Sequence, residues 1–220
     1  NLNMEFKHSD KVILMNINRV FVAGWTGRDE EAVNHHIQEL AELGISPPST
    51  VPLYYRVSRG VLTQLGKIDV LGHATSGEVE PFLLHADGEI WIGLASDHTD
   101  RDLEAHSIAA SKQACLKPIT SEVWRYSDVE SHLDQLILQC TIEENGVQRV
   151  YQDGSLAAIR PLAELINESG FNDGDAMLCG TLAAIGGVRP AQHYTMSLTD
   201  PVLNRQMELC YSVEILPIVI

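Results

Sequence analysis

Short apolar runs and apolar–polar alternation dominate the chain, and this pattern is typical of β-strands. Asn145-Gly146 stands between two such runs and favours the type I′ turn of a tight hairpin. A second hairpin is expected to close around residues 86–89. The pattern predicts further strands at residues 4–6, 12–17, 20–22, 53–57, 138–142 and 147–151, and on either side of 199–201.

Helical periodicity is clearest at residues 29–43. Acidic residues fill its first turn, a glycine follows its end, and apolar residues recur at helical spacing at Val33, Ile37, Leu40 and Leu43. Two weaker patterns predict a short helix at 103–113 and an amphipathic helix at 156–167.

Composition fits one soluble domain. The 220 residues are 45% hydrophobic and 20% charged, and they contain no repeat, linker or low-complexity segment. We therefore predict a single α+β domain over residues 1–220, in which a strand-rich mixed sheet curls into a roll or barrel with a few peripheral helices. Residues 1–23 are expected to supply the first strands of this domain.

The net charge of −15 argues against nucleic-acid and anionic-membrane partners, because these need clustered Lys and Arg. Four scattered cysteines without metal-ligand spacing indicate reduced thiols. No segment has the length of a membrane span, and the N-terminal residues do not resemble a signal peptide. A cytoplasmic protein is therefore expected.

Three acidic residues give the strongest chemical signal. Glu78 and Glu80 are two apart in a strand-like run, so their side chains share one face. Asp97 ends the next apolar run and would return to the same end of the hairpin. Close carboxylates must take up a proton or bind a cation, and a hard divalent ion prefers oxygen ligands. The alternative is a set of solvent-facing acids on an edge strand.

Five short motifs in this order make the chain resemble the fumarylacetoacetate hydrolase (FAH) superfamily. They are His36-Ile37-Gln38-Glu39, Glu78-Val79-Glu80, residues 96–102 (SDHTDRD), Lys112 with Pro118, and residues 174–181 (GDAMLCGT). Each motif is weak alone, but their order is specific. The resemblance implies a β roll of the FAH C-terminal-domain type and a divergent bacterial branch of the family.

The resemblance also implies site roles. Glu78, Glu80 and Asp97 would bind Mg²⁺, or else Mn²⁺ or Ca²⁺, and His36 with Glu39 would form a general base. Lys112 would stabilise negative charge, while Tyr55, Arg56, Gly180 and Thr181 would bind substrate. The implied reaction is hydrolysis or lysis of a small β-diketo acid or 2-oxo acid through a metal-bound enolate, by a homodimer.

Alternatives remain at this level. The same scaffold could serve a decarboxylase, hydratase or isomerase, or a small-molecule binding protein that has lost catalysis. Asp97, Arg101 and Asp102 could instead form a structural ion-pair cluster at a turn, which is the preferred interpretation for Arg101 and Asp102. His35, His98 and His106 are interpreted as surface residues. Pro81 departs from the family pattern and predicts an edge strand or a bend beside the glutamates. The glycine-proline step after the lysine is absent, and Thr181 is followed by Leu182.

Overall fold

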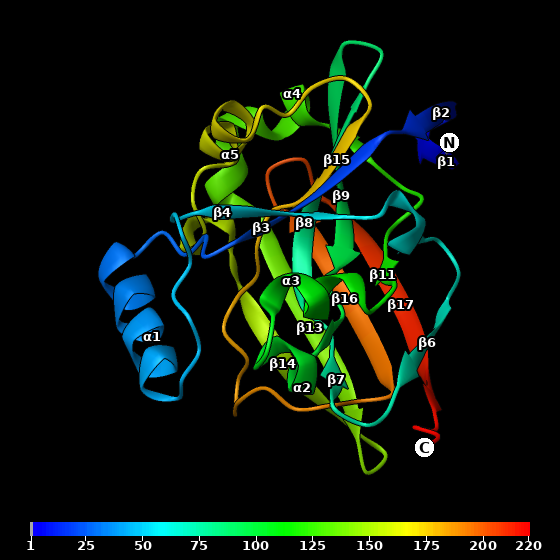
Figure 1. The fold of residues 1–220 in the computed structure, drawn as a ribbon. Coiled ribbons are helices and arrows are strands. Elements are labelled where there is room, and N and C mark those ends of the chain that lie inside the picture. Colours follow the sequence, from blue (N-terminus) through cyan, green and yellow to red (C-terminus); the bar gives the residue numbers. More distant parts are fainter. Residues whose placement is uncertain (1) are drawn as a thin grey trace.

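The computed structural model describes residues 2–220 as a strand-rich α+β fold built on two large sheets (Figure 1). One sheet has six strands in the order β12-β9-β8-β15-β3-β4, and the other has five in the order β14-β13-β16-β17-β6. Both sheets mix parallel and antiparallel pairs. The strand-rich mixed fold predicted from the sequence is therefore confirmed.

The strands of the six-stranded sheet are β3 (Arg19–Gly24), β4 (Leu53–Val57), β8 (Val79–Ala86), β9 (Glu89–Ser96), β12 (Trp124–Arg125) and β15 (Asp175–Leu178). Those of the five-stranded sheet are β6 (Lys67–Leu71), β13 (Ile137–Glu144), β14 (Val147–Ser155), β16 (His193–Asp200) and β17 (Arg205–Leu216). Three two-stranded ladders join β1 (Leu2–His8) to β2 (Lys11–Ile17), β5 (Leu62–Thr63) to β11 (Lys117–Pro118), and β7 (Thr75–Ser76) to β10 (Thr99–Asp100).

Helices are short and lie around the sheets. They are α1 (Glu30–Glu42), α2 (Arg101–Glu104), α3 (Ile108–Gln113), α4 (Tyr126–Val129) and α5 (Leu162–Ser169), with 3₁₀ turns η1 (Arg59–Val61), η2 (Glu130–Gln135) and η3 (Leu156–Ala158). Among residues 2–220, no helix has the length and apolar composition needed to cross a membrane.

Two of the predicted helices are interrupted. The segment predicted at 103–113 divides into α2 and α3, because Ser107 is extended and its Oγ caps the amide of Ala110. The segment predicted at 156–167 starts as the 3₁₀ turn η3, and α5 begins only after Pro161. Gly170 ends α5 in the left-handed conformation (φ 72°), as expected for a C-terminal cap.

The six-stranded sheet is covered on both faces. Leu83 packs in the apolar core between the two large sheets, whereas its neighbours Phe82 and Leu84 pack in a second core on the opposite face. The β1–β2 hairpin covers that second core with Phe6, Ile13, Met15 and Ile17. Because β8 is buried on both faces, its central residues 81–84 are all apolar and do not alternate with polar ones.

Pro81 lies in an internal strand, so the edge-strand interpretation is wrong. β8 pairs with β9 on one side and with β15 on the other. The carbonyl of Pro81 accepts from the Cys179 amide (3.1 Å), one residue after β15 ends at Leu178. The missing proline N–H therefore points to the side on which β15 has ended, and the ladder with β9 loses no donor.

Candidate metal centre

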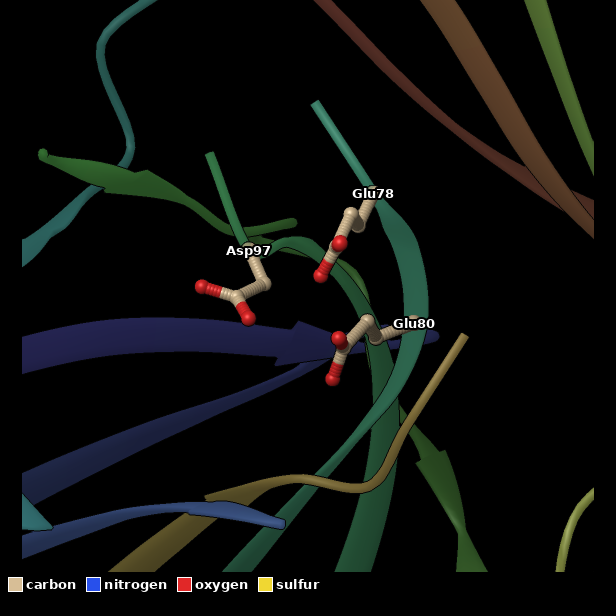
Figure 2. A group of neighbouring side chains, drawn as sticks. All are labelled: Glu78, Glu80 and Asp97. Carbon is tan, nitrogen blue, oxygen red and sulfur yellow. The ribbon is translucent and has the colours of Figure 1, made fainter. Parts of the chain in front are cut away.

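Glu78, Glu80 and Asp97 converge at one end of the β8–β9 hairpin (Figure 2). The antiparallel register places Glu80 opposite Ala95 and Val79 opposite Ser96. The amide of Asp97 donates to the carbonyl of Glu78 at 2.9 Å, which holds the two segments together just beyond the ladder. One carboxylate oxygen from each acid lies within 4.8 Å of the other two.

Glu80 is a buried carboxylate that lacks a cationic partner among the described residues. Its Oε2 accepts one hydrogen bond, from the amide of Gly180 at 2.9 Å. Burial raises the Glu80 pKa well above its usual range, and the charges of Asp97 and Glu78 raise it further. Three oxygen donors around an uncompensated buried charge fit a hard divalent cation.

Two lysines stabilise the charge of Asp97. Lys112 Nζ lies 2.7 Å from Oδ2, and Lys117 Nζ lies 2.8 Å from Oδ1. Burial alone would raise the Asp97 pKa, but the two ammonium groups lower it below the ordinary range. Lys117 is fully buried and also donates to the carbonyl of His98, whereas Lys112 lines the neighbouring cavity. Lys112 is thus the lysine that a bound molecule could contact.

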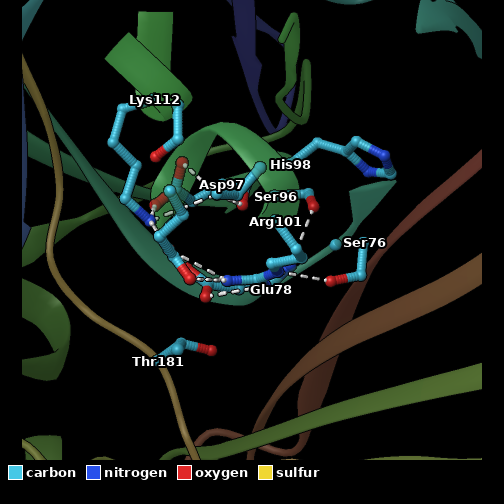
Figure 3. A network of polar contacts seen from close by, with 12 residues as sticks. Ser76, Glu78, Ser96, Asp97, His98, Arg101, Lys112 and Thr181 are labelled. Carbon is cyan, nitrogen blue, oxygen red and sulfur yellow. Dashed lines mark hydrogen bonds and ion pairs between the residues drawn. The ribbon is translucent and has the colours of Figure 1, made fainter. Parts of the chain in front are cut away.

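Arg101 is ion-paired, as the structural interpretation expected, but its partners are Glu78 and Glu104 in the acid cluster. Its guanidinium lies 2.9 Å from Glu78 and 3.2 Å from Glu104, and its Nε donates to Ser76 at 2.7 Å (Figure 3). Lys112 approaches the other oxygen of Glu78 at 3.4 Å. Asp102 is exposed on the surface.

His98 was expected on the surface, but it is completely buried. Its ring bonds to the Thr75 hydroxyl and the Tyr211 hydroxyl, both at 2.9 Å. Burial lowers the pKa of His98 to about 3, with Lys117 and Arg101 acting in the same direction. The alternation of β9 continues past its end and directs this side chain inward, while His35 and His106 are exposed as expected.

The acids open into a cavity of about 520 Å³ between the six-stranded sheet, α1, α3 and the loop after β15. Eleven of the lining residues are polar or aromatic: Trp25, Thr26, His36, Tyr55, Glu78, Glu80, Asp97, Arg101, Glu104, Lys112 and Thr181. Apolar residues and glycines form the rest: Val22, Ala23, Gly24, Gly27, Val33, Leu40, Ile45, Ile108, Gly180 and Val188.

The predicted base pair lies on the outer wall of this cavity. His36 lines it from α1, a helix that buries none of its residues and stands beside the sheets in Figure 1. Glu39 lies 3.5 Å from His36 Nδ1 and also 3.2 Å from His35 Nδ1. Both members of the pair are more than half exposed.

Gly180 and Thr181 lie where the loop after β15 crosses the acid pair. Gly180 has φ 119°, and a Cβ there would collide with Thr26 Oγ1. The Thr181 hydroxyl donates to the Val79 carbonyl (2.7 Å) and accepts from Gln152 (2.8 Å). These bonds fix the loop against the strand that carries Glu80.

The two substrate-binding candidates on β4 face opposite ways. Tyr55 lines the cavity and accepts a hydrogen bond from the Trp25 indole at 3.1 Å. Arg56 is exposed and stacks over the ring of Phe21 at 5.0 Å, away from the cavity lining. Alternation along the strand accounts for this difference.

Sequence reasoning did not identify three lining residues: Trp25, Thr26 and Glu104. Trp25 lies in the turn after β3 with φ 59°, a conformation that is uncommon for a large residue. An aromatic residue inside a glycine-flanked turn was the available signal. Glu104 lies three residues after Arg101 in α2, so helical spacing could have indicated their ion pair, but its place in the cavity lining depends on how α2 packs.

The fold is that of the FAH group. It matches a Yersinia pestis CO92 protein assigned to the fumarylacetoacetate hydrolase family, with TM-score 0.62 and 19% identity over 91% of this chain and 94% of that one. It also matches a Burkholderia cenocepacia protein assigned as a fumarylpyruvate hydrolase, with TM-score 0.66 and 16% identity over 99% and 97%. A third match is a 2-keto-3-deoxy-D-arabinonate dehydratase complexed with magnesium and 2,5-dioxopentanoate, with TM-score 0.62 and 17% identity over 96% and 79%.

Within that fold group, residues 23–211 match the family model described as Protein of unknown function (DUF2848). The chain belongs to the DUF2848 family. Comparison with curated proteins by sequence gives no match. The resemblance inferred from five short motifs is thereby confirmed at the level of the fold.

Proposed function

We propose that this protein is a metal-dependent hydrolase or lyase that acts on a small 2-oxo or β-diketo acid. One observation carries the proposal: Glu78, Glu80 and Asp97 bring carboxylate oxygens within 4.8 Å of one another at the inner end of a cavity, and among residues 2–220 buried Glu80 has no cationic partner. A divalent cation there, Mg²⁺ in the first instance, would polarise substrate oxygens and stabilise the negative charge that C–C cleavage produces.

The side chains around the acids can perform the remaining steps. His36, with Nδ1 directed to Glu39, would accept a proton from water at Nε2 as the water oxygen attacks the substrate carbonyl. The bond between that carbonyl carbon and the adjacent CH₂ breaks, and its electron pair stays on the oxo-acid fragment. The former CH₂ carbon then takes a proton and becomes a methyl group. The products are therefore a carboxylic acid and a 2-oxo acid that ends in this methyl group.

Two further groups would act on the substrate. Lys112 lines the cavity next to Asp97 and would bind the substrate carboxylate or the developing oxyanion. Thr181 and the backbone at Gly180 border the same space and would contact a carbonyl oxygen. Because His36 is largely exposed, α1 would have to move towards the acids for attack to occur.

The test uses acylpyruvates and oxaloacetate with Mg²⁺ or Mn²⁺, with both products quantified by NMR. Turnover that EDTA and Glu80→Gln abolish, and that the surface control Glu208→Gln retains, would support the proposal. Metal binding without turnover of any compound would instead favour the small-molecule binding protein. Release of CO₂, dehydration or double-bond migration in place of C–C hydrolysis would identify a decarboxylase, hydratase or isomerase on the same scaffold.

We also propose a homodimer, on the basis of the family resemblance, and a cytoplasmic location, on the basis of the scattered cysteines and the composition of the sequence. Light scattering on the purified chain tests the first, and cell fractionation tests the second.

A further inference from the structure

We infer that the substrate carries an uncharged, apolar tail beyond its oxo-acid head, so that alkyl or aryl dioxo acids are preferred over dicarboxylates. This inference rests on the proposed function and names the substrate class for the same cavity. Its basis is the distribution of charge and apolar surface among the lining residues.

All permanent charges of the lining are gathered at the acid end. Four carboxylates, Glu78, Glu80, Asp97 and Glu104, face two cations, Arg101 and Lys112. Both cations are already ion-paired with these acids. A divalent cation would balance the remaining charge, and the chelating head of an oxo acid would then add negative charge of its own. No cation of the described lining is left for a second carboxylate.

Apart from His36, the outer part of the cavity is lined by apolar and aromatic residues. Val33 and Leu40 contribute from α1, Ile45 follows that helix, Ile108 begins α3, and Val188 lies in the loop after β15. The apolar faces of Trp25 and Tyr55 extend the same wall. A hydrocarbon tail would remove these side chains from water, at a gain of about fourfold in affinity per buried methylene.

The borders of this wall repel an anion. Helix α1 carries the acids Glu30, Glu31, Glu39 and Glu42 and contains neither Lys nor Arg. Two nearby arginines in the sequence point elsewhere: Arg28 binds Asp134 through both Nη atoms (2.9 and 2.8 Å), and Arg189 binds Glu144 through Nε and Nη2 (2.8 and 3.0 Å). A carboxylate at the end of the tail would therefore lose hydration without gaining a lysine or arginine partner from the described lining, and His36 already lies beside Glu39.

The experiment compares two non-hydrolysable probes that share a chelating head. These are N-hexyl oxamate and its counterpart in which a carboxylate replaces the terminal methyl group, titrated by calorimetry in the presence of Mg²⁺. We expect the hexyl compound to bind at least about tenfold more tightly. Equal or tighter binding of the carboxylated probe would overturn the inference.

Two variants locate the effect. Val188→Lys places a cation on the apolar wall, and we expect it to narrow or reverse the preference between the probes. Val202→Lys makes the same change at a comparably exposed valine in the β16–β17 turn, outside the cavity, and should leave the preference unchanged. An equal response of the two variants would contradict the assigned tail position.

The two hypotheses fail differently. If neither oxamate binds in the presence of Mg²⁺, the chelating site and the proposed function fail, and the tail preference fails with them. If dioxo acids are hydrolysed but those ending in a carboxylate have the higher kcat/KM, the proposed function stands and the apolar-tail inference is wrong.

Discussion

The amide of Gly180 donates a hydrogen bond of 2.9 Å to Oε2 of Glu80, although the two residues are 100 positions apart in the chain. The contact exists because β15 lies beside β8 and because Gly180 adopts φ 119° directly after that strand. It orients a buried carboxylate that has no other polar partner among residues 2–220. The candidate metal centre thus depends on the loop after β15 as well as on its own hairpin.

Gly180→Ala should damage this arrangement. The new Cβ would collide with Thr26 Oγ1, and φ 119° is unfavourable for alanine, so a loss of about 1–3 kcal/mol in unfolding free energy is expected, together with weaker Mg²⁺ binding. Denaturant unfolding and calorimetry measure the two effects. Gly88→Ala is the matched control, because Gly88 also has positive φ (73°) but open space around it. Equal stability losses in both variants would show that the contact with Thr26 is unimportant.

Glu80→Gln should stabilise the metal-free protein and abolish its response to metal. The raised pKa of Glu80 means that the folded state binds this proton more tightly than the unfolded state does. Ionisation of Glu80 therefore costs stability as the pH rises through its folded pKa, and glutamine removes that cost. We expect a higher Tm than wild type without metal at neutral pH, and no further rise with Mg²⁺.

Glu208→Gln removes the same charge from the exposed face of β17 and is the control for that experiment. It should keep the wild-type rise in Tm with Mg²⁺. A Glu80→Gln protein with undiminished Mg²⁺ affinity would exclude this acid as a ligand.

Lys112→Met should destabilise the metal-free protein by roughly 3–5 kcal/mol, because it leaves buried Asp97 and Glu78 without one of their cations. The acid cluster becomes more negative in this variant. Mg²⁺ should therefore raise the unfolding free energy of the variant by more than it raises that of wild type. Thermal unfolding with and without Mg²⁺ measures this difference. An identical Mg²⁺ gain in both proteins would indicate that Lys112 is not electrostatically coupled to the metal centre.

Asp200 makes a pH-dependent contribution far from the acids. Burial would raise its pKa, but the amides of Leu203 and Val202 and the ring of His132 hold the pKa below its usual value. The stability it provides is therefore present above the unfolded pKa of about 4 and is lost as the pH falls through the lower folded value. Asp200→Asn should cost roughly 1–3 kcal/mol at neutral pH, and the difference from wild type should vanish in acid. A difference independent of pH would contradict this assignment.

The local pattern of hydrophobic and polar residues was sufficient to predict much of the secondary structure. Alternation predicted the β13–β14 hairpin around Asn145-Gly146, and periodicity predicted α1 within one residue at each end. Both features depend on neighbours in sequence. The same reasoning did not anticipate that Ser107 would divide a predicted helix. A serine can either continue a helix or cap the start of the next one, and the sequence pattern does not distinguish these two conformations.

The placement of Pro81 and His98 depended on long-range pairing. Proline in a strand favours an edge, but β15 ends one residue short of it and leaves an internal strand undisturbed. His98 follows the candidate ligand Asp97 and precedes a polar run, yet Tyr211 of β17 and Thr75 of β7 enclose it. Neither partner is near in sequence, so no local pattern could indicate the burial.

The sequence by itself determined which residues could form the acid cluster, because the spacing of Glu78, Glu80 and Asp97 on two strands of one hairpin fixes their common face. It also supplied the His36–Glu39 pair and the order of motifs. Only the tertiary structure decided which lysine faces the cavity, that Arg56 points away from it, and that the outer wall is apolar. Those features arise where segments distant in the chain pack together, and such long-range packing leaves no periodic pattern in the sequence.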